Sequence, residues 1–510
     1  MDLMKTLLQT LLAPDDVHNR QLLENAHPPA WVNPKPHDIY NLVVLGAGTA
    51  GLVATAGAAA LGARVALVEE LLMGGDCLNF GCVPSKALIR ASRAASAPKE
   101  AHEYGGSAAG TNGFDFSRAM ERMRRLRAEI SAHDSVKRFS SLGAQVFLGA
   151  ARFKSRDTVE VDGLSLKFKK AIIATGGRPA RPDISGLAEA GFLTNETVFS
   201  LTELPARLVV VGAGPIGCEL AQAFQRLGSQ VTIITRGYRL LPREDPEVSS
   251  LLAQRFLREG IRLVFGANLR RAEGQNGEKV LHFTRGECEE KAEGTEILLS
   301  VGRVPNTEGL NLEAAGVEYD AKGVRVDDRL RTTNPDIYAA GDVCSPFKFT
   351  HAAEAMARIA LQNALFFGRK KASSLVIPWA TYTDPEVAHV GITEEEAQNR
   401  GEQVETFTLP LAEVDRAILD SETEGFARVH MDAKTRRIVG ATLVSRHAGE
   451  SIGEFVLAMN QGLKLEALSG VIHPYPTQAE VIKRLGDASM RSRLKPWMKH
   501  LLEKYFSFRR

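Results

Sequence analysis

Residues 40–51 read YNLVVLGAGTAG, an apolar run that leads into a turn with three glycines. An alanine-rich stretch with helical character follows at residues 52–61. The pattern predicts a strand, a glycine turn and a helix, and the glycines have separate tasks. Gly46 permits the tight turn, Gly48 lets backbone approach a pyrophosphate, and Gly51 lets the helix pack closely on the strand.

The same arrangement occurs a second time. Residues 208–211 lead into GAGPIG, with Gly212, Gly214 and Gly217, and then into the helical stretch ELAQAFQRLG. A lone glycine fingerprint is weak evidence, because glycine-rich turns recur for packing reasons. Two complete copies argue against chance, so the sequence predicts an α/β chain with two dinucleotide-binding units.

The two copies differ where the second strand ends. In the first copy Glu69 lies 23 residues after Gly46, and a carboxylate there accepts hydrogen bonds from a free ribose 2′-hydroxyl. In the second copy the same offset falls on Thr235, followed by Arg236. Further arginines lie nearby at Arg239 and Arg243. Guanidinium groups bind a 2′-phosphate, so we expect FAD at the first site and NADPH at the second. NADH, with the arginines as a solvated surface, is the alternative.

Composition indicates an ordinary globular protein. The formal net charge is +2 and charged residues make up 24% of the chain, so nothing favours nucleic acid as a partner. Five cysteines are too few for a disulfide-stapled secreted fold. No signal peptide or apolar run of membrane-spanning length is evident. We therefore expect a cytoplasmic protein.

Two of the cysteines lie close together in GGDCLNFGCVPSK, residues 74–86. Cys82 is predicted to open a helix that is marked by Pro84. A thiol at a helix N-terminus has its thiolate stabilised by the helix dipole, which suits disulfide exchange. The spacing from Cys77 to Cys82 does not match common zinc patterns, and an inert structural pair is the alternative.

Several segments follow the order of one family: both glycine fingerprints, residues 74–86, ATGGRP at 174–179, AAGD at 339–342 and HPYPTQAE at 473–480. Over residues 39–485 the chain resembles the pyridine nucleotide-disulfide oxidoreductases, which include dihydrolipoamide dehydrogenase, glutathione reductase and mercuric reductase. The resemblance implies a homodimeric flavoenzyme in which NAD(P)H reduces FAD, and the flavin passes two electrons to a disulfide of Cys77 and Cys82. It also implies a glutathione reductase-like fold, with two Rossmann-like domains and a C-terminal α+β dimerisation domain.

The domain boundaries follow from the motifs and the resemblance together. We expect an N-terminal extension at 1–38, a discontinuous FAD-binding domain at 39–188 and 314–374, an NAD(P)-binding domain at 189–313, a dimerisation domain at 375–490 and a basic amphipathic tail at 491–510. The tail is expected to pack on its own dimer, with contact to an anionic membrane as the alternative.

The resemblance assigns further roles. Cys82 would face the flavin as a thiolate, and Cys77 would meet the substrate. Lys86 and Glu219 resemble an ion pair that the family keeps beside the flavin. Asp342 resembles the residue that binds the flavin's ribityl chain, and a helix N-cap at Asp342 is compatible with that role. Other expected cofactor contacts are Thr175, Gly176 and Gly302.

The C-terminal motif departs from the family pattern. Aligning its Pro-Thr pair and Glu480 places Tyr475 where disulfide-reducing members carry a histidine. Tyrosine, with a pKa near 10, is a poor base at neutral pH. His473 can serve as the base only if the local backbone differs. In having a tyrosine at this position, the chain resembles the mercuric reductases, which handle a thiolate-bound soft metal ion.

The substrate prediction is divided, because no cysteine follows Cys344 to supply the vicinal pair of mercuric reductases. We expect an NADPH-dependent reductase of a thiol-bound soft metal ion. No resident metal is expected, although Cys77 and Cys82 can contact a metal substrate. The alternatives are a low-molecular-weight disulfide reductase or dihydrolipoamide dehydrogenase, and a non-enzymatic flavin-binding interaction protein.

Two remaining features have structural roles as their expected function. Cys218, Cys288 and Cys344 are expected to serve in packing. The arginine cluster at residues 118–127 is expected to form a solvated helix face.

Overall fold

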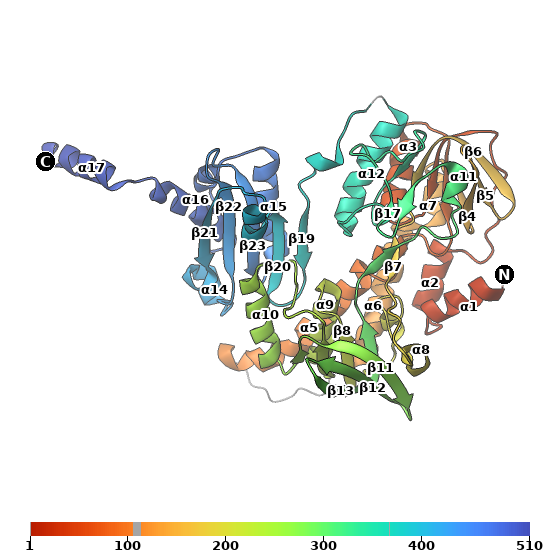
Figure 1. Ribbon diagram of the computed structural model, residues 1–510, viewed down its shortest axis with the longest axis horizontal. Coiled ribbons are helices and arrows are strands. Elements are labelled where there is room, and N and C mark those ends of the chain that lie inside the picture. Colours follow the sequence, from red (N-terminus) through yellow and green to blue (C-terminus); the bar gives the residue numbers. More distant parts are fainter. Residues whose placement is uncertain (1, 106–113, 367) are drawn as a thin grey trace. The chain divides into compact units, whose positions relative to one another are not determined.

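The computed structural model describes residues 2–105, 114–366 and 368–510. They form two compact units, Met1–Tyr238 with Phe256–Leu375, and Arg239–Arg255 with Val376–Arg510. Figure 1 labels many of the elements of both units.

The first unit contains a seven-stranded sheet of order β3-β2-β1-β6-β5-β4, in which β18 also pairs with β6. Its strands are β1 (Tyr40–Leu45), β2 (Val65–Glu69), β3 (Gln145–Leu148), β4 (Ala151–Ser155), β5 (Thr158–Val161), β6 (Leu164–Ile173) and β18 (Ile337–Ala339). The strand β1 is parallel to β2 and β6 and is buried at five of its six positions. Such a nearly continuous apolar run is typical of a parallel strand covered on both faces.

A second, fully parallel sheet in the same unit has the order β10-β9-β8-β14. Its strands are β8 (Arg207–Val211), β9 (Gln230–Ile234), β10 (Arg262–Val264) and β14 (Glu296–Leu299). An antiparallel sheet follows, formed by β11 (Asn268–Gln275), β12 (Glu278–Arg285) and β13 (Cys288–Gly294). The short strands β7 (Gly177–Pro179) and β15 (Arg303–Pro305) pair antiparallel.

The helices of this unit include α3 (Thr49–Ala60), α4 (Gly75–Asn79), α5 (Cys82–Glu100), α9 (Pro215–Leu227) and α12 (Thr350–Leu365). Both glycine turns therefore join a parallel strand to a helix, as predicted. This arrangement, with a separate α+β unit at the C-terminal end, confirms the predicted fold class. The shorter elements are α7 (Val136–Ser141), α8 (Leu187–Ala190), α11 (Leu312–Ala315), β16 (Tyr319–Asp320) and β17 (Gly323–Val324).

The N-terminal segment forms α1 (Asp2–Leu11) and α2 (Val17–Ala26), and it corrects one prediction. The helix α6 (Phe116–Ser131) carries the arginine cluster. Arg127 is only 1% exposed and donates to Asn19 Oδ1 at 2.7 Å, while Arg124 pairs with Asp16 at 2.5 Å. The cluster is therefore not a wholly solvated face, because the N-terminal helices cover part of it.

The second unit is built on a five-stranded antiparallel sheet of order β19-β20-β23-β22-β21. Its strands are β19 (Pro378–Thr381), β20 (Glu386–Gly391), β21 (Val404–Pro410), β22 (Phe426–Asp432) and β23 (Ile438–Ser445). Its helices are α13 (Glu394–Asn399), α14 (Asp415–Leu419), α15 (Ala448–Asn460), α16 (Glu480–Ser492) and α17 (Pro496–Phe508), and most of α10 (Pro246–Arg258) also belongs to it. None of the described helices has the length and apolar content that a membrane crossing requires.

Candidate active site

The two glycine turns share one backbone geometry. Gly46 and Gly212 have φ angles of +97° and +111°, which an L side chain rarely adopts. A Cβ atom on Gly51 would lie 1.8 Å from the carbonyl oxygen of Gly46, and one on Gly217 would lie 2.3 Å from that of Gly212. Glycine is therefore required at positions 51 and 217 for each helix to pack on its turn.

The middle glycines begin the two helices. Gly48 and Gly214 are the N-caps of α3 and α9, and neither helix has a side-chain cap. A Cβ atom on Gly75 would lie 2.5 Å from the Cα of Gly48, so the cysteine-bearing segment approaches the first turn closely. The uncapped N–H groups and the lack of side chains fit the phosphates of FAD at the first turn and of a nicotinamide nucleotide at the second.

The acidic residue of the first unit is fixed beside its turn. Glu69 Oε2 accepts a hydrogen bond from the N–H of Ala47 at 2.6 Å, and Oε1 accepts one from Leu71 at 2.8 Å. Burial raises the pKa of Glu69, against these hydrogen bonds. In the second unit the position that corresponds to Glu69 is Thr235, directly after β9, and the exposed Arg236 follows it.

The two cysteines lie on consecutive helices. Cys77 is in the one-turn helix α4, and Cys82 is the first residue of α5, as predicted. Between them, a Cβ atom on Gly81 would lie 2.9 Å from the carbonyl oxygen of Asp76, so glycine permits the close turn. Both cysteines are free thiols, and Cys82 Sγ lies 3.3 Å from Thr350 Oγ1 at the start of α12.

The two thiols differ in acidity. A hydrogen bond from Cys77 lowers the pKa of Cys82 to about 6, and the Thr350 hydroxyl and the charge of Lys86 act in the same direction. The pKa of Cys77 is raised, first by its hydrogen bond to Cys82 and then by desolvation. The pair thus favours a thiolate at Cys82 and a proton on Cys77.

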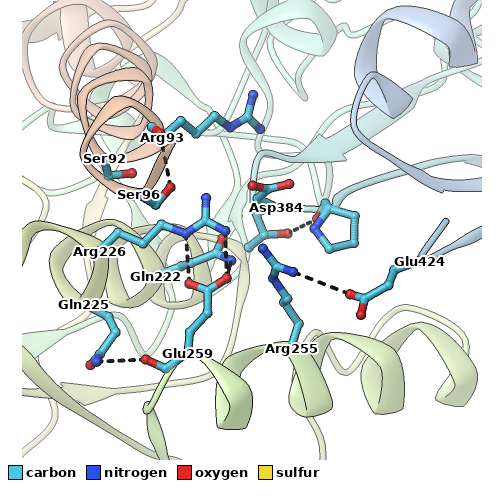
Figure 2. Close-up of polar contacts among 12 residues, drawn as sticks. Ser92, Arg93, Ser96, Gln222, Gln225, Arg226, Arg255, Glu259, Asp384 and Glu424 are labelled. Carbon is cyan, nitrogen blue, oxygen red and sulfur yellow. Dashed lines mark hydrogen bonds and ion pairs between the residues drawn. The ribbon is translucent and has the colours of Figure 1, made fainter. Parts of the chain in front are cut away.

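An ion pair joins the cysteine helix to the second glycine unit. Lys86 Nζ on α5 lies 2.8 Å from Glu219 Oε2 on α9, and the Glu219 side chain is only 6% exposed. The far end of α9 is held by Arg226, whose Nε and Nη2 atoms donate to the carboxylate of Glu259 at 2.8 and 2.7 Å (Figure 2). The predicted pair Lys86 and Glu219 is therefore brought together on anchored helices.

A buried arginine that the sequence analysis did not select joins several predicted elements. Arg303 Nη1 lies 3.3 Å from Asp76 Oδ2, and its Nε lies 3.3 Å from Asp342 Oδ2. Its Nη2 donates to the carbonyl oxygen of Gly177 at 2.6 Å. Asn195, also missed, donates to Asp76 Oδ1 at 2.9 Å. In the sequence, Arg303 directly follows Gly302 and Asp76 directly precedes Cys77, and this adjacency to predicted site residues could have indicated both.

Asp342 is not a helix N-cap, which corrects the prediction. It lies in a turn after β18, and α12 begins only at Thr350, with Phe349 as its N-cap. Pro346 intervenes, and a proline disfavours helical backbone in the residue before it. Burial raises the pKa of Asp342, against the attraction of Arg303.

The other predicted cofactor residues meet at the β7–β15 pair. Thr175 Oγ1 donates to the carbonyl oxygen of Asn306 at 2.7 Å, and the N–H of Asn306 donates to Gly176 at 3.0 Å. The carbonyl oxygen of Gly302 accepts from Ala180 at 2.9 Å. No atom lies within 4 Å of a Cβ built on Gly176 or Gly302, so both glycines leave open space.

The C-terminal motif lies in the second unit. Tyr475 is 71% exposed, and its hydroxyl donates to Asp415 Oδ2 at 2.7 Å. This hydrogen bond raises the pKa of Tyr475, and the charges of Asp415 and Glu480 add to the effect. His473 Nε2 lies 3.0 Å from Glu454 Oε2, and its Nδ1 lies 3.3 Å from the carbonyl oxygen of Val471.

The remaining cysteines fit the packing prediction unequally. Cys218 is fully buried and Cys344 packs at the edge of the first unit's core. Cys288 is exposed at the start of β13, so the packing role expected for it is wrong. Among the described residues, no group of three or more His, Cys, Asp or Glu side chains could hold a metal ion.

Comparisons with known proteins agree with this geometry. The family model described as pyridine nucleotide-disulphide oxidoreductase matches residues 40–357, and the model of that family's dimerisation domain matches residues 377–485. A mercuric reductase of Lysinibacillus sphaericus is 38% identical over 448 residues, which cover 88% of this chain and 82% of that protein. A dihydrolipoyl dehydrogenase of Mycoplasma pneumoniae is 34% identical over 452 residues, covering 87% of this chain and 97% of the relative.

Solved structures show the same architecture. The Cu(II) complex of the HOCl-induced flavoprotein disulfide reductase RclA from Escherichia coli has a TM-score of 0.80 at 28% identity, covering 89% of this chain and all of that one. LpdA from Mycobacterium tuberculosis has a TM-score of 0.80 at 26% identity, covering 88% of this chain and 99% of that one.

Proposed function

Because the chain belongs to the pyridine nucleotide-disulphide oxidoreductase family, we propose that it is a homodimeric, NADPH-dependent reductase of a thiol-bound soft metal ion of the Hg(II) class. Members of this family bind FAD and use NAD(P)H, and the bound flavin supplies two-electron transfer between the nucleotide and a cysteine pair. The proposed reaction converts NADPH, a proton and a metal dithiolate into NADP⁺, the reduced metal and two thiols.

The observation that supports a metal ion as the substrate is the hydrogen bonding of the Tyr475 hydroxyl and its raised pKa. Its hydroxyl donates to Asp415, and its pKa lies above the usual tyrosine value. It is therefore a poor group for passing a proton to a leaving thiolate near neutral pH, which reduction of a disulfide requires of the acid–base residue. Exchange of thiolate ligands on a metal ion needs no such base, because the protons of the enzyme thiols pass to the released ligands.

The cysteine pair suits this exchange. Cys82, with a pKa of about 6, is the more readily ionised thiol, and Cys77 holds the proton of the pair. Soft divalent metals prefer thiolate ligands. We assign Cys77 to the first contact with the incoming metal, and Cys82 to the thiolate that would face the flavin. Lys86, paired with Glu219, holds positive charge beside that thiolate.

NADPH is proposed over NADH because Thr235, at the position that corresponds to Glu69 at the end of β2, carries no acid, and the exposed Arg236 follows it directly after β9. A guanidinium attracts the 2′-phosphate, whereas a carboxylate repels it. The ratio of kcat/KM for the two nucleotides tests this choice, and a clear preference for NADH contradicts it.

A disulfide substrate is the second candidate, and one contact favours it. His473 Nε2 lies 3.0 Å from the carboxylate of Glu454, which is the pairing expected of an acid–base histidine. However, the other ring nitrogen faces the carbonyl oxygen of Val471, so both nitrogens are engaged. The ring would have to turn before it could exchange a proton with a substrate sulfur.

Single variants separate the two candidates. For disulfide reduction, His473→Asn should lower the turnover of glutathione disulfide or lipoamide by roughly a hundredfold or more. For metal reduction, the same variant should leave the turnover of a Hg(II)–dithiol complex within about twofold, since no base is used. Failure of the wild-type protein to oxidise NADPH with any acceptor would instead support a non-enzymatic flavin-binding protein.

A further inference from the structure

The helix α17, Pro496–Phe508, presents an apolar face that nothing in its own unit covers. None of its residues is buried, and Figure 1 shows it standing apart from the five-stranded sheet of that unit. Trp497, Leu501, Tyr505 and Phe508 are 64%, 61%, 50% and 91% exposed. Their spacing of three or four residues places them on one face of the helix.

Positive charge is concentrated around the same helix. Residues 491–510 contain seven Lys or Arg and one Glu, which gives a net charge of +6. The whole chain has a net charge of +2, so the preceding 490 residues together carry −4. Lys499 and Lys504 lie within the helix, and Arg509 and Arg510 follow it directly. The basic segment therefore differs from the rest of the chain in the sign of its charge.

We propose that α17 lies on the surface of an anionic lipid bilayer, with its apolar face at the boundary between headgroups and acyl chains. Lys499 lies on the side of the helix opposite the apolar face, whereas Lys504 borders that face. Lysines at the edge of an apolar helix face can extend their charged ends to the headgroups while their stems stay on the apolar surface. Tryptophan and tyrosine favour this depth because their rings have both an apolar body and a polar group. With 13 residues, α17 is too short to span a bilayer.

Charge favours a lipid surface over a second copy of the helix. If two copies of α17 packed face to face, they would bring two segments of charge +6 together. Anionic headgroups instead attract each lysine and arginine near the surface. The connection from α16 is short, since α16 ends at Ser492 and α17 begins at Pro496. The enzyme would therefore be held close to the membrane as a peripheral protein.

Vesicle sedimentation of the full-length protein tests the proposal. Wild type should pellet with phosphatidylserine-containing vesicles and remain soluble with phosphatidylcholine alone. High salt should reduce the pelleted fraction by roughly tenfold, because exposed charges are screened. The double variant Leu501→Glu with Phe508→Glu should lose binding by a similar factor. Lys499→Glu with Lys504→Glu should weaken binding to the anionic vesicles.

The controls separate membrane contact from damage to the protein. Val32 is 82% exposed and lies far from the tail in sequence, so Val32→Glu should pellet like wild type. NADPH oxidation in solution should be unchanged in every variant. Equal pelleting of wild type and the Leu501/Phe508 variant overturns the proposal. A second result also overturns the proposal: wild type does not bind the vesicles, and the Leu501/Phe508 variant has a different oligomeric mass in light scattering. That result would assign α17 to contact with a second copy of the chain.

Discussion

The Nζ atom of Lys86 lies 2.8 Å from Oε2 of Glu219, and this contact joins the helix that begins with Cys82 to the helix that begins at the second glycine turn. Lys86 also lowers the pKa of Cys82 through its charge. One lysine therefore both stabilises the Cys82 thiolate and neutralises a buried carboxylate.

Replacing Lys86 by methionine should raise the pKa of Cys82. In the reduced wild-type protein, the rate of alkylation by iodoacetamide should rise with pH around a midpoint near the pKa of about 6. Loss of the positive charge disfavours the thiolate, so the midpoint moves to higher pH. Arg90→Met is the matched control, because Arg90 is an exposed cation on the same helix. An unchanged midpoint in Lys86→Met would contradict the assignment.

Arg127 should stabilise the redox segment through the N-terminal helices. It is 1% exposed and donates to the carbonyl oxygen of Asn79, two residues after Cys77, and to Asn19. Arg127→Met leaves these acceptors unpaired and should lower the free energy of unfolding by roughly 1–3 kcal/mol. It should also speed alkylation of Cys77. Arg125→Met removes an exposed arginine two residues earlier on the same helix and should change the free energy of unfolding by less than about 0.5 kcal/mol. Equal effects of the two variants would refute the prediction.

Glu244 should make the stability of the protein depend on pH. Burial raises the pKa of Glu244 from 4.5 to about 7, and Trp379 Nε1 donates to its Oε1 at 2.6 Å. The folded state therefore keeps the proton of Glu244 to a higher pH than the unfolded state does. The stabilisation of the folded state that results is full below pH 4.5 and is lost as the pH rises through 7. Glu244→Gln does not titrate. The melting temperature of the variant minus that of wild type should therefore increase between about pH 5 and about pH 8. A pH-independent difference would show that Glu244 does not titrate in this range.

Arg236 should contribute to nucleotide choice through the 2′-phosphate. Arg236→Ala should raise the KM for NADPH by roughly tenfold or more, because a charge-assisted contact is lost. The KM for NADH provides the internal control and should change little. If both Michaelis constants rise together, Arg236 affects the fold of the second unit and not the phosphate.

The sequence predicted those parts of the site that depend on local backbone requirements. Gly46, Gly51, Gly212 and Gly217 are needed where a turn and a helix approach each other, and the structure has these contacts. The start of α5 at Cys82 was also predictable, from Pro84. Such features depend on a few consecutive residues, so the pattern alone identifies them.

Features that depend on distant segments were not predictable. The burial of Arg124 and Arg127 requires Asp16 and Asn19 from helix α2 and its N-cap. Arg303 reaches an acid beside Cys77 that precedes it by more than 200 residues. No local periodicity encodes these contacts, because the partners meet only after both segments have folded. The substrate depends on the surroundings of Tyr475, which the sequence likewise leaves open.

The most direct test of the proposed function is an anaerobic comparison of NADPH-dependent turnover with a Hg(II)–dithiol complex, glutathione disulfide, lipoamide and Cu(II). Tyr475→Phe should leave the turnover of the Hg(II) complex unchanged, because the proposed exchange uses no base at this position. Tyr319→Phe is the matched control, since Tyr319 is a second exposed tyrosine that donates to a carboxylate, at 2.7 Å. The proposal predicts that kcat/KM for the Hg(II) complex exceeds that for both disulfides by roughly a hundredfold, and that Tyr319→Phe has no effect. Efficient reduction of either disulfide by the wild-type enzyme, with loss of that activity in His473→Asn, would contradict it.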